Sequence, residues 1–211
     1  MSNKFLISIL VLMAIIGGVI ITSKKKNDPA TTSTVQPSSH VIGVGTGNVT
    51  LTEYGDFECP SCARFHPILK EVKSFYGDQI KFQFKHFPLT EIHQNALLAS
   101  RASEAAHMQG KFWEMHDKLF ETQNIWKSIS DPTSIFTNYA QELGLDTAKF
   151  TTDLKGSDVN DIIRADREEA KGLDLTGTPS FLINGQKIEN PDSLDGFKKA
   201  IDEALAKNKT Q

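Results

Sequence analysis

The chain contains only two cysteines, and they lie two residues apart in the segment Cys59-Pro60-Ser61-Cys62. Each can pair only with the other, so no other disulfide can form within the chain. A C-x-x-C pair can cycle between a dithiol and a disulfide, or it can supply two ligands of a metal site. The segments on either side of the pair decide between these two chemistries.

The pair is predicted to lie where a strand turns into a helix. Residues 49–54 alternate as a strand does and end at a Gly-Asp turn. Downstream, apolar residues recur at helical spacing: Phe65, Ile68, Leu69, Val72, Phe75 and Tyr76. Cys59 then occupies the helix N-cap, and Pro60 takes the first helical position, which suits proline. Free backbone N–H groups and the helix dipole lower the pKa of a thiol there, whereas Cys62 is expected to be buried and to act as the resolving thiol.

A metal site is the alternative from another class of function. Structural zinc needs four ligands, and near the pair only His66 could join Cys59 and Cys62, which leaves the set one short. The sequence therefore favours thiol–disulfide exchange over a metallochaperone or metal-binding module built on these three side chains.

Glu53 is the first candidate partner of the pair. It shares a strand face with Val49 and Leu51, because side chains alternate with a period of two. A buried carboxyl has a raised pKa and could carry a proton for Cys62. The alternative is an exposed glutamate on an edge strand.

The remaining chain predicts a sheet interrupted by helices. Short strands are expected at Ile80–Phe84, Phe181–Ile183 and Gln186–Ile188, the last two joined by an Asn-Gly turn. Between them the pattern is helical from about 90 to 175. A final helix presents one apolar face, made of Leu194, Phe197, Ile201 and Leu205.

Three segments together carry a family resemblance: Glu53–Cys62, Lys85–Leu89 and Thr176–Phe181. They resemble the DsbA-type thiol–disulfide oxidoreductases of the thioredoxin superfamily, and especially the membrane-anchored, BdbD-like bacterial proteins. The resemblance implies an α/β thioredoxin-like fold over residues 41–207, with a central mixed sheet flanked by helices. It also implies that the helical stretch of about 90–175 is an inserted subdomain.

The resemblance assigns roles to matching positions. Cys59 would be the attacking thiol of a redox-active disulfide, Cys62 the resolving thiol and Glu53 the buried acid. Thr178 would pair with the backbone of a substrate, and Pro179 would be a cis-proline that faces the two sulfurs.

The active-site loop, Pro60-Ser61, contains one departure from the family. The best-known oxidase of the family has histidine where this chain has Ser61, and the two middle residues help to set thiolate stability. The strength of this protein as an oxidant therefore cannot be carried over. His86 and His93 could line the active-site face, but surface or capping positions are the more common use of such histidines.

The function implied is that of a dithiol oxidase, without a cofactor, which introduces disulfides into secreted or surface proteins through Cys59 and Cys62. Its partners would be reduced extracytoplasmic proteins and a quinone-linked membrane protein of the DsbB or VKOR type that reoxidises it. A disulfide reductase or isomerase would use the same residues in the other direction.

The N-terminal residues 1–26 suggest a membrane anchor or a signal segment. Residues 5–22 carry no charge and three lysines follow them, which favours an uncleaved single-pass anchor over a removed signal peptide. Residues 27–40 are rich in Thr, Ser and Pro, as a flexible linker is. The positive-inside rule would place the lysine-rich side of the segment, and the domain that follows it, in the cytoplasm, by a margin of one charge. The oxidase function instead favours a catalytic domain outside the cytoplasm. Cleavage would instead give a secreted or periplasmic protein.

The charge balance excludes one class of partner. The chain has 23 basic and 26 acidic side chains, a net charge of −3, and four of the lysines lie in the N-terminal segment. No basic patch interleaved with aromatic residues appears, so nucleic acid is not an expected partner.

Overall fold

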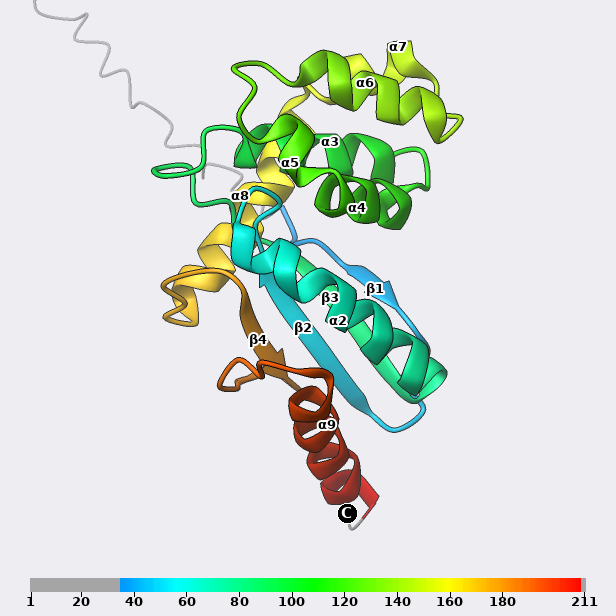
Figure 1. Ribbon diagram of the computed structural model, residues 1–211, viewed down its shortest axis with the longest axis vertical. Helices are drawn as coiled ribbons and strands as arrows, with labels where there is room; N and C mark the ends of the chain where they lie inside the picture. The colour runs from blue at the N-terminus through cyan, green and yellow to red at the C-terminus, as the bar shows by residue number, and fades with distance from the viewer. Residues whose placement is uncertain (1–34, 210–211) are drawn as a thin grey trace, which may run out of the picture. The chain divides into compact units, whose positions relative to one another are not determined.

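The structure, a computed structural model, describes residues 35–209. Its sheet contains β1 (His40–Ile42), β2 (Val49–Gly55), β3 (Ile80–His86), β4 (Ser180–Ile183) and β5 (Gln186–Lys187), in the order β1-β3-β2-β4-β5 (Figure 1). Strands β2 and β3 run parallel, and the other neighbours are antiparallel. This mixed sheet confirms the thioredoxin-like fold that the resemblance implies.

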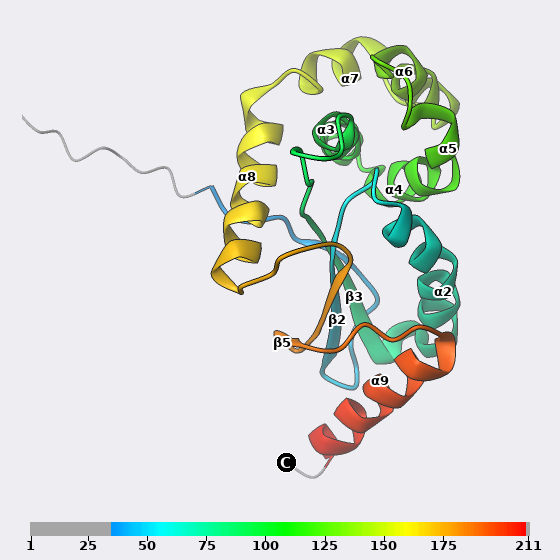
Figure 2. The ribbon, with the colours of Figure 1, turned by 60° about the vertical axis from the view of Figure 1, so that its left-hand side comes forward.

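Helices cover both faces of the sheet. The helices α2 (Pro60–Tyr76) and α9 (Leu194–Lys209) lie on one side and α8 (Ser157–Gly172) on the other (Figure 2), and a short 3-10 turn, Gly77–Gln79, follows α2. Val49 and Leu51 of β2 belong to the same apolar cluster as α2 and α9. Tyr54, of opposite parity, packs with Ala170 of α8. The strand alternation therefore divides β2 between two cores.

The helical insertion lies between β3 and β4, as predicted. It consists of α3 (Ala96–His107), α4 (Phe112–Glu121), α5 (Gln123–Trp126), α6 (Thr133–Glu142), α7 (Thr147–Asp153) and α8. Figure 2 shows α3 end-on with the other helices of the insertion around it. Five alanines of α3 are fully buried, and their small side chains let the neighbouring helices approach closely: Ala96, Ala99, Ala102, Ala105 and Ala106.

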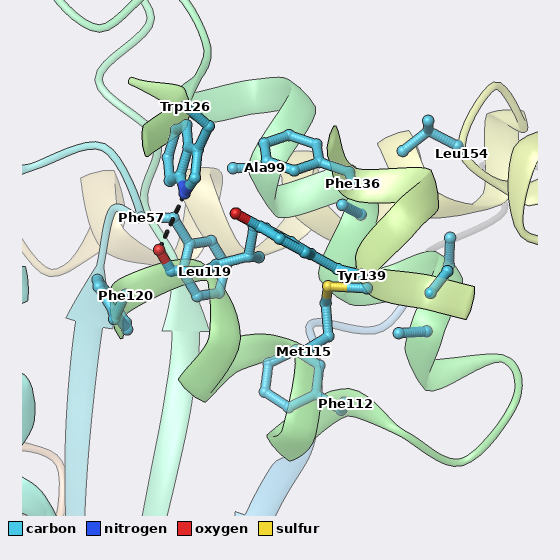
Figure 3. Packing of buried hydrophobic residues seen from close by; sticks show 14 of the residues in the cluster. Phe57, Ala99, Phe112, Met115, Leu119, Phe120, Trp126, Phe136, Tyr139 and Leu154 are labelled. Atoms are coloured by element: carbon cyan, nitrogen blue, oxygen red, sulfur yellow. Dashed lines mark hydrogen bonds between the residues drawn. The ribbon is translucent and has the colours of Figure 1, made fainter. Parts of the chain in front are cut away.

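Aromatic side chains fill the space around α3 (Figure 3). Trp126 and Phe136 meet edge to face, with ring centroids 5.3 Å apart. The indole N–H of Trp126 donates to the carbonyl of Leu119 at 3.0 Å, which satisfies the polar atom of this fully buried residue. Both cysteines belong to this same cluster. The redox pair is therefore part of the core of the insertion.

The sequence patterns did not predict β1, α5 or α7, because each is too short to show a period. The ordered contacts of the domain also begin at an earlier residue than the Thr-, Ser- and Pro-rich composition of 27–40 suggests. The backbone N–H and the hydroxyl of Ser38 donate to Asp166 at 2.7 and 2.6 Å, and His40 begins β1. Both residues fall within 27–40, the stretch expected to be a linker.

The proposed anchor at residues 5–22, and the rest of 1–34, lie outside the described residues. Within residues 35–209, no helix is both long enough and apolar enough to cross a bilayer.

A buried carboxylate joins β1, β3 and α3. One oxygen of Glu104 bonds to Nε2 of His40 at 2.5 Å and to Nε2 of His86 at 2.7 Å, and all three side chains are at least 95% buried. His86 is therefore neither a surface residue nor a capping residue. Burial alone would raise the pKa of Glu104, but the hydrogen bonds from the two histidines lower it to about 2.

Replacing Glu104 should destabilise the fold. Glu104→Ala leaves two buried imidazoles without their acceptor, so the free energy of unfolding should fall by about 3 kcal/mol, and by less in Glu104→Gln. Because the folded pKa of about 2 lies below the unfolded value of 4.5, the ionised carboxylate contributes fully above 4.5 and its contribution is lost as the pH falls toward 2. Urea unfolding of both variants between neutral pH and pH 2 measures this. Equal midpoints for Glu104→Ala and the wild type at neutral pH would contradict it.

Candidate active site

The cysteines occupy the first turn of α2, as the sequence predicts. Cys59 is the N-cap, in an extended conformation, and Pro60 takes the first helical position. Cys59 is 6% exposed and Cys62 is completely buried. Ser61 is half-buried, and its hydroxyl oxygen accepts a hydrogen bond from Arg64 at 3.0 Å. Of the two cysteines, only Cys59 therefore has any exposure, next to the exposed Pro60.

The segment Thr178-Pro179 precedes β4, the neighbour of β2, and lies beside Cys59. Tyr54 of β2 pairs with Ser180 of β4, so the residues before β4 lie beside the chain that leaves β2. The peptide bond between Thr178 and Pro179 is cis. The Cys59 thiol donates to the carbonyl of Thr178 at 3.4 Å. Residues 119 positions apart in the sequence are therefore in contact at the reactive sulfur.

The two thiols differ strongly in acidity. A hydrogen bond from the Cys62 thiol is the main cause that lowers the pKa of Cys59 to about 5, and it outweighs the opposing effect of burial. The backbone N–H groups of Ser61 and Cys62 act in the same direction, as expected at a helix N-terminus. Burial raises the pKa of Cys62 well above its usual value. At neutral pH the negative charge is therefore held on Cys59.

Glu53 lies behind the pair and is 1% exposed, as the strand alternation predicts. Burial raises its pKa to about 8, although the nearby Lys73 opposes this shift. Oε1 of Glu53 has no hydrogen-bond partner among the described residues. The negative charge of Glu53 also contributes to the raised pKa of Cys62. At neutral pH the carboxyl group therefore holds a proton close to the buried thiol.

Asp56 holds the loop that leads into Cys59. One oxygen of this fully buried carboxylate accepts the backbone N–H of Glu58 at 2.7 Å. The other accepts the backbone N–H of Leu89 at 2.9 Å and bonds to Nδ1 of His93 at 2.7 Å. His93 is therefore a partner of the active-site loop rather than a free surface residue. These contacts tie the turn after β2 to the segment that enters the insertion.

Gln123 of α5 holds the same loop from the other side. Its amide nitrogen donates to the carbonyl of Phe57 at 2.8 Å and to that of Cys59 at 3.0 Å. Nothing in the sequence pointed to Gln123, because it lies on a four-residue helix 61 positions after Cys62. Asp56 and Glu58 could have been singled out as candidate site residues, because they are acidic residues within the segment Glu53–Cys62. Their hydrogen-bond partners, however, depend on the tertiary fold.

The structure does not bring together the metal ligands that the sequence offered as an alternative. Within residues 35–209, the groups of three or more possible ligands are His40 with His86 and Glu104, and His66 with His116 and Asp117. Neither group contains a cysteine. His66 lies against α4 instead, so Cys59, Cys62 and His66 do not converge as ligands in this structure.

Comparison with known proteins agrees with this geometry. Residues 35–203 match the sequence model of a family described as thioredoxin. The chain belongs to the thioredoxin family. Two solved structures are 25% identical to it: a thioredoxin-like oxidoreductase from Silicibacter pomeroyi DSS-3 (TM-score 0.68, covering 83% of this chain and 98% of that one) and oxidised BdbD from Bacillus subtilis (TM-score 0.71, 81% and 96%).

Wolbachia pipientis alpha-DsbA1 has the same fold, with a TM-score of 0.72 at 23% identity over 82% of this chain and 94% of that one. These matches confirm the DsbA-type resemblance within the thioredoxin superfamily.

The chain is also similar to part of some much longer curated proteins. It is 39% identical over 167 residues to Na(+)/H(+) antiporter NhaA 1 of Mycolicibacterium gilvum. This match covers 77% of this chain and 26% of that protein. It is also 39% identical over 173 residues to the protein of the same name from Mycolicibacterium vanbaalenii, and this match covers 80% of this chain and 27% of that protein. The chain thus spans about a quarter of the length of these relatives.

The lowered pKa of Cys59 predicts its reactivity. The thiolate is the nucleophile, so the rate of alkylation of the reduced protein by iodoacetamide should reach half its maximum near pH 5. Mass spectrometry after limited alkylation should place the label on Cys59, with Cys62 unmodified. Cys59→Ser is the matched control and should abolish the fast reaction. A half-maximum near 9, the usual value for a thiol, would contradict the assigned environment.

Proposed function

We propose that this protein is a thiol–disulfide oxidoreductase that acts as a dithiol oxidase through Cys59 and Cys62. The observation that carries the proposal is the placement of the pair: Cys59 begins α2 and lies 3.4 Å from the carbonyl of Thr178, and Cys62 is completely buried. This placement lowers the pKa of Cys59 and raises that of Cys62. A thiol of low pKa makes a good leaving group and stabilises the reduced form, and both effects favour transfer of the disulfide to a substrate. The similarity to the oxidoreductase from Silicibacter pomeroyi and to BdbD supports the same class of chemistry.

The reaction begins with the enzyme in the disulfide form. A substrate thiolate attacks Sγ of Cys59, the Cys59–Cys62 bond breaks, and a mixed disulfide forms on Cys59. Cys62 leaves as a thiolate, which is unfavourable in its buried position, and the protonated Glu53 can supply the proton. A second substrate thiolate then attacks the substrate sulfur and expels the Cys59 thiolate. The substrate gains a disulfide, and the enzyme gains two electrons as a dithiol.

Two features beside Cys59 suit a polypeptide substrate. The carbonyl of Thr178 lies at the reactive sulfur and could accept a backbone N–H of an extended chain in place of the Cys59 thiol. Two apolar side chains are also exposed on segments that bond to the active-site loop: Ile92, next to His93, is 73% exposed, and Ile125, on α5 with Gln123, is 61% exposed. Asn95 links the active-site loop to the turn after α5, because its backbone N–H donates to Glu58 and its amide donates to the carbonyls of Lys127 and Ile129.

Location and turnover complete the proposal. An oxidase needs an oxidising compartment, so we place the catalytic domain outside the cytoplasm, attached by a single-pass anchor at residues 5–22. Its substrates would be reduced extracytoplasmic proteins. A quinone-linked membrane protein of the DsbB or VKOR type would restore the disulfide after each cycle. Ion transport is not proposed, because the chain matches only about a quarter of the antiporters.

The direction of the reaction can be measured by equilibrating the Cys59/Cys62 pair in glutathione buffers of graded ratio. We expect a potential closer to about −120 mV, the range of a strong oxidase, than to about −270 mV, that of thioredoxin. The oxidised protein should also introduce a disulfide into a reduced, unfolded substrate, and Cys59→Ala should not. A thioredoxin-like potential, together with efficient reduction of an added disulfide, would instead select the reductase.

The proposed orientation can be tested in intact cells. A variant with both native cysteines replaced by alanine and Ser130→Cys carries one thiol at an exposed loop position. A membrane-impermeant maleimide should label this thiol before lysis, because the catalytic domain lies outside the membrane. A cytoplasmic protein with an exposed cysteine serves as the control for cell integrity. Labelling that requires lysis would contradict the extracytoplasmic location.

A further inference from the structure

A second group of polar side chains lies where α2 meets α4. His66 lies on α2, one turn beyond Cys62, and His116 and Asp117 are neighbours on α4. One possible ligand atom of each lies within 4.8 Å of the others. The distance from Asp117 Oδ1 to His66 Nε2 is 3.7 Å, and to His116 Nδ1 it is 2.9 Å. The helices themselves lie next to each other (Figures 1 and 2).

The two imidazoles have unsatisfied nitrogen atoms. Their side chains are 6% and 2% exposed, and Nε2 of each is buried without a hydrogen-bond partner in residues 35–209. A separation of 3.7 Å is too long for a hydrogen bond between His66 and Asp117. Buried polar atoms in proteins normally have partners, so the orphan Nε2 of His66, 3.7 Å from Asp117 Oδ1, suggests a missing one.

The other group of possible ligands differs in this respect. At Glu104 a single carboxylate oxygen bonds directly to Nε2 of both His40 and His86, at 2.5 and 2.7 Å. Those two nitrogen atoms are satisfied by the protein itself, and the spacing leaves no room for an ion between them and the oxygen. In the group around His66, Asp117 bonds directly to Nδ1 of His116 at 2.9 Å, but its separation of 3.7 Å from Nε2 of His66 has the wider spacing of two ligands around one ion.

The ionisation of the group around His66 suits a metal. Burial lowers the pKa of His66 to about 4 and that of His116 to about 3, so both imidazoles are neutral at pH 7. Burial would raise the pKa of Asp117, but the hydrogen bond from His116 lowers it. Two neutral imidazoles and one carboxylate are a donor set of zinc and related divalent transition metals.

A fourth ligand and a route from solvent are also present. Oε1 of Glu121 lies 4.0 Å from His66 Nε2, at the limit for an ion pair, and currently bonds to Lys70 at 2.8 Å. A cleft of about 490 Å³ opens here, lined in part by His66, Lys70 and Glu121. Both side chains of the Lys70–Glu121 pair are about half exposed, so Lys70 can turn away into water. Lys73 also lies nearby, but its ammonium packs over the rings of Phe82 and Trp113.

We propose that His66, His116 and Asp117 form a binding site for one divalent transition-metal ion of the zinc class, separate from the cysteine pair. Glu121 or water completes the coordination. The ion joins α2, which carries the redox pair, to α4 of the insertion, so it stabilises the contact between them. This proposal does not depend on the direction, or the existence, of the thiol–disulfide activity.

The test uses the full chain in its oxidised form, in which the disulfide leaves no thiolate to bind zinc. Calorimetric titration with zinc chloride should give one ion per chain, and zinc should raise the thermal midpoint. His66→Gln and Asp117→Asn should each weaken binding by more than the ~10–100-fold loss that is typical of groups outside the ligand shell. Both positions border the cleft or the helix surface, so these variants should fold, as circular dichroism without metal would show. His107→Gln, at an exposed histidine outside the group, should bind as the wild type does.

Three results would overturn the proposal. The oxidised protein could fail to bind zinc, or it could bind with an affinity that neither His66→Gln nor Asp117→Asn changes. Zinc could also bind only after reduction, which would place it on the cysteines. Cobalt substitution adds a direct readout, because a tetrahedral nitrogen–oxygen site gives visible absorption without the intense thiolate band that cysteine ligation would add.

Discussion

Tyr54 of β2 lies opposite Ser180 of β4, and this register position determines how the ends of the two strands meet. The chain leaving β2 enters the turn to Cys59, and the chain entering β4 brings Thr178 and Pro179. Because side chains alternate along a strand, a shift of one residue would turn Phe181 out of the core that it shares with α2 and α9. Core packing therefore fixes the register, and the register places a carbonyl 3.4 Å from the reactive sulfur.

Burial then makes the two sulfurs unequal. Cys59 and Cys62 lie one helical turn apart, but only Cys59 lies at the helix start, where backbone N–H groups are free to stabilise a negative charge. Cys62 faces the protein interior and the carboxyl of Glu53. Because burial keeps that carboxyl protonated at neutral pH, it does not place a full negative charge beside the pair. Burial thus explains the neutral Glu53 and the neutral Cys62, whereas hydrogen bonds, the one from Cys62 first, overcome burial to stabilise the charge on Cys59.

The sequence was sufficient to predict an element where a periodic pattern of apolar residues began or ended at a proline or an Asn-Gly turn. Proline after Cys59 marked the first turn of α2, and Asn184-Gly185 marked the hairpin of β4 and β5, where both residues have positive φ. Alternation along β2 was enough to predict that Glu53 is buried. The insertion was predicted from its helical periods, although α5 and α7 were too short to be seen.

What the sequence did not reveal are the polar contacts between distant segments. Asp166 lies on the apolar stripe of α8, which indicates that it is buried, but no local pattern shows that it bonds to Ser38 and His86, 128 and 80 positions away. Gln123 likewise has no local signature. His66 was considered with the cysteines because it follows them closely in sequence, but the helix geometry turns it toward α4. Proximity in sequence is a weak guide to which ligands converge.

The insertion does more than enlarge the domain, since it supplies part of the active-site turn. The carbonyl of Cys59 accepts the backbone N–H of Ala63, which begins the helix, and also the amide of Gln123. Gln123 bonds to Phe57 as well, and so it holds the carbonyls on both sides of Glu58. A movement of α5 would therefore move the backbone whose N–H groups stabilise the Cys59 thiolate. The acidity of that thiol thus depends on helices added to the thioredoxin-like sheet as well as on the C-x-x-C segment itself.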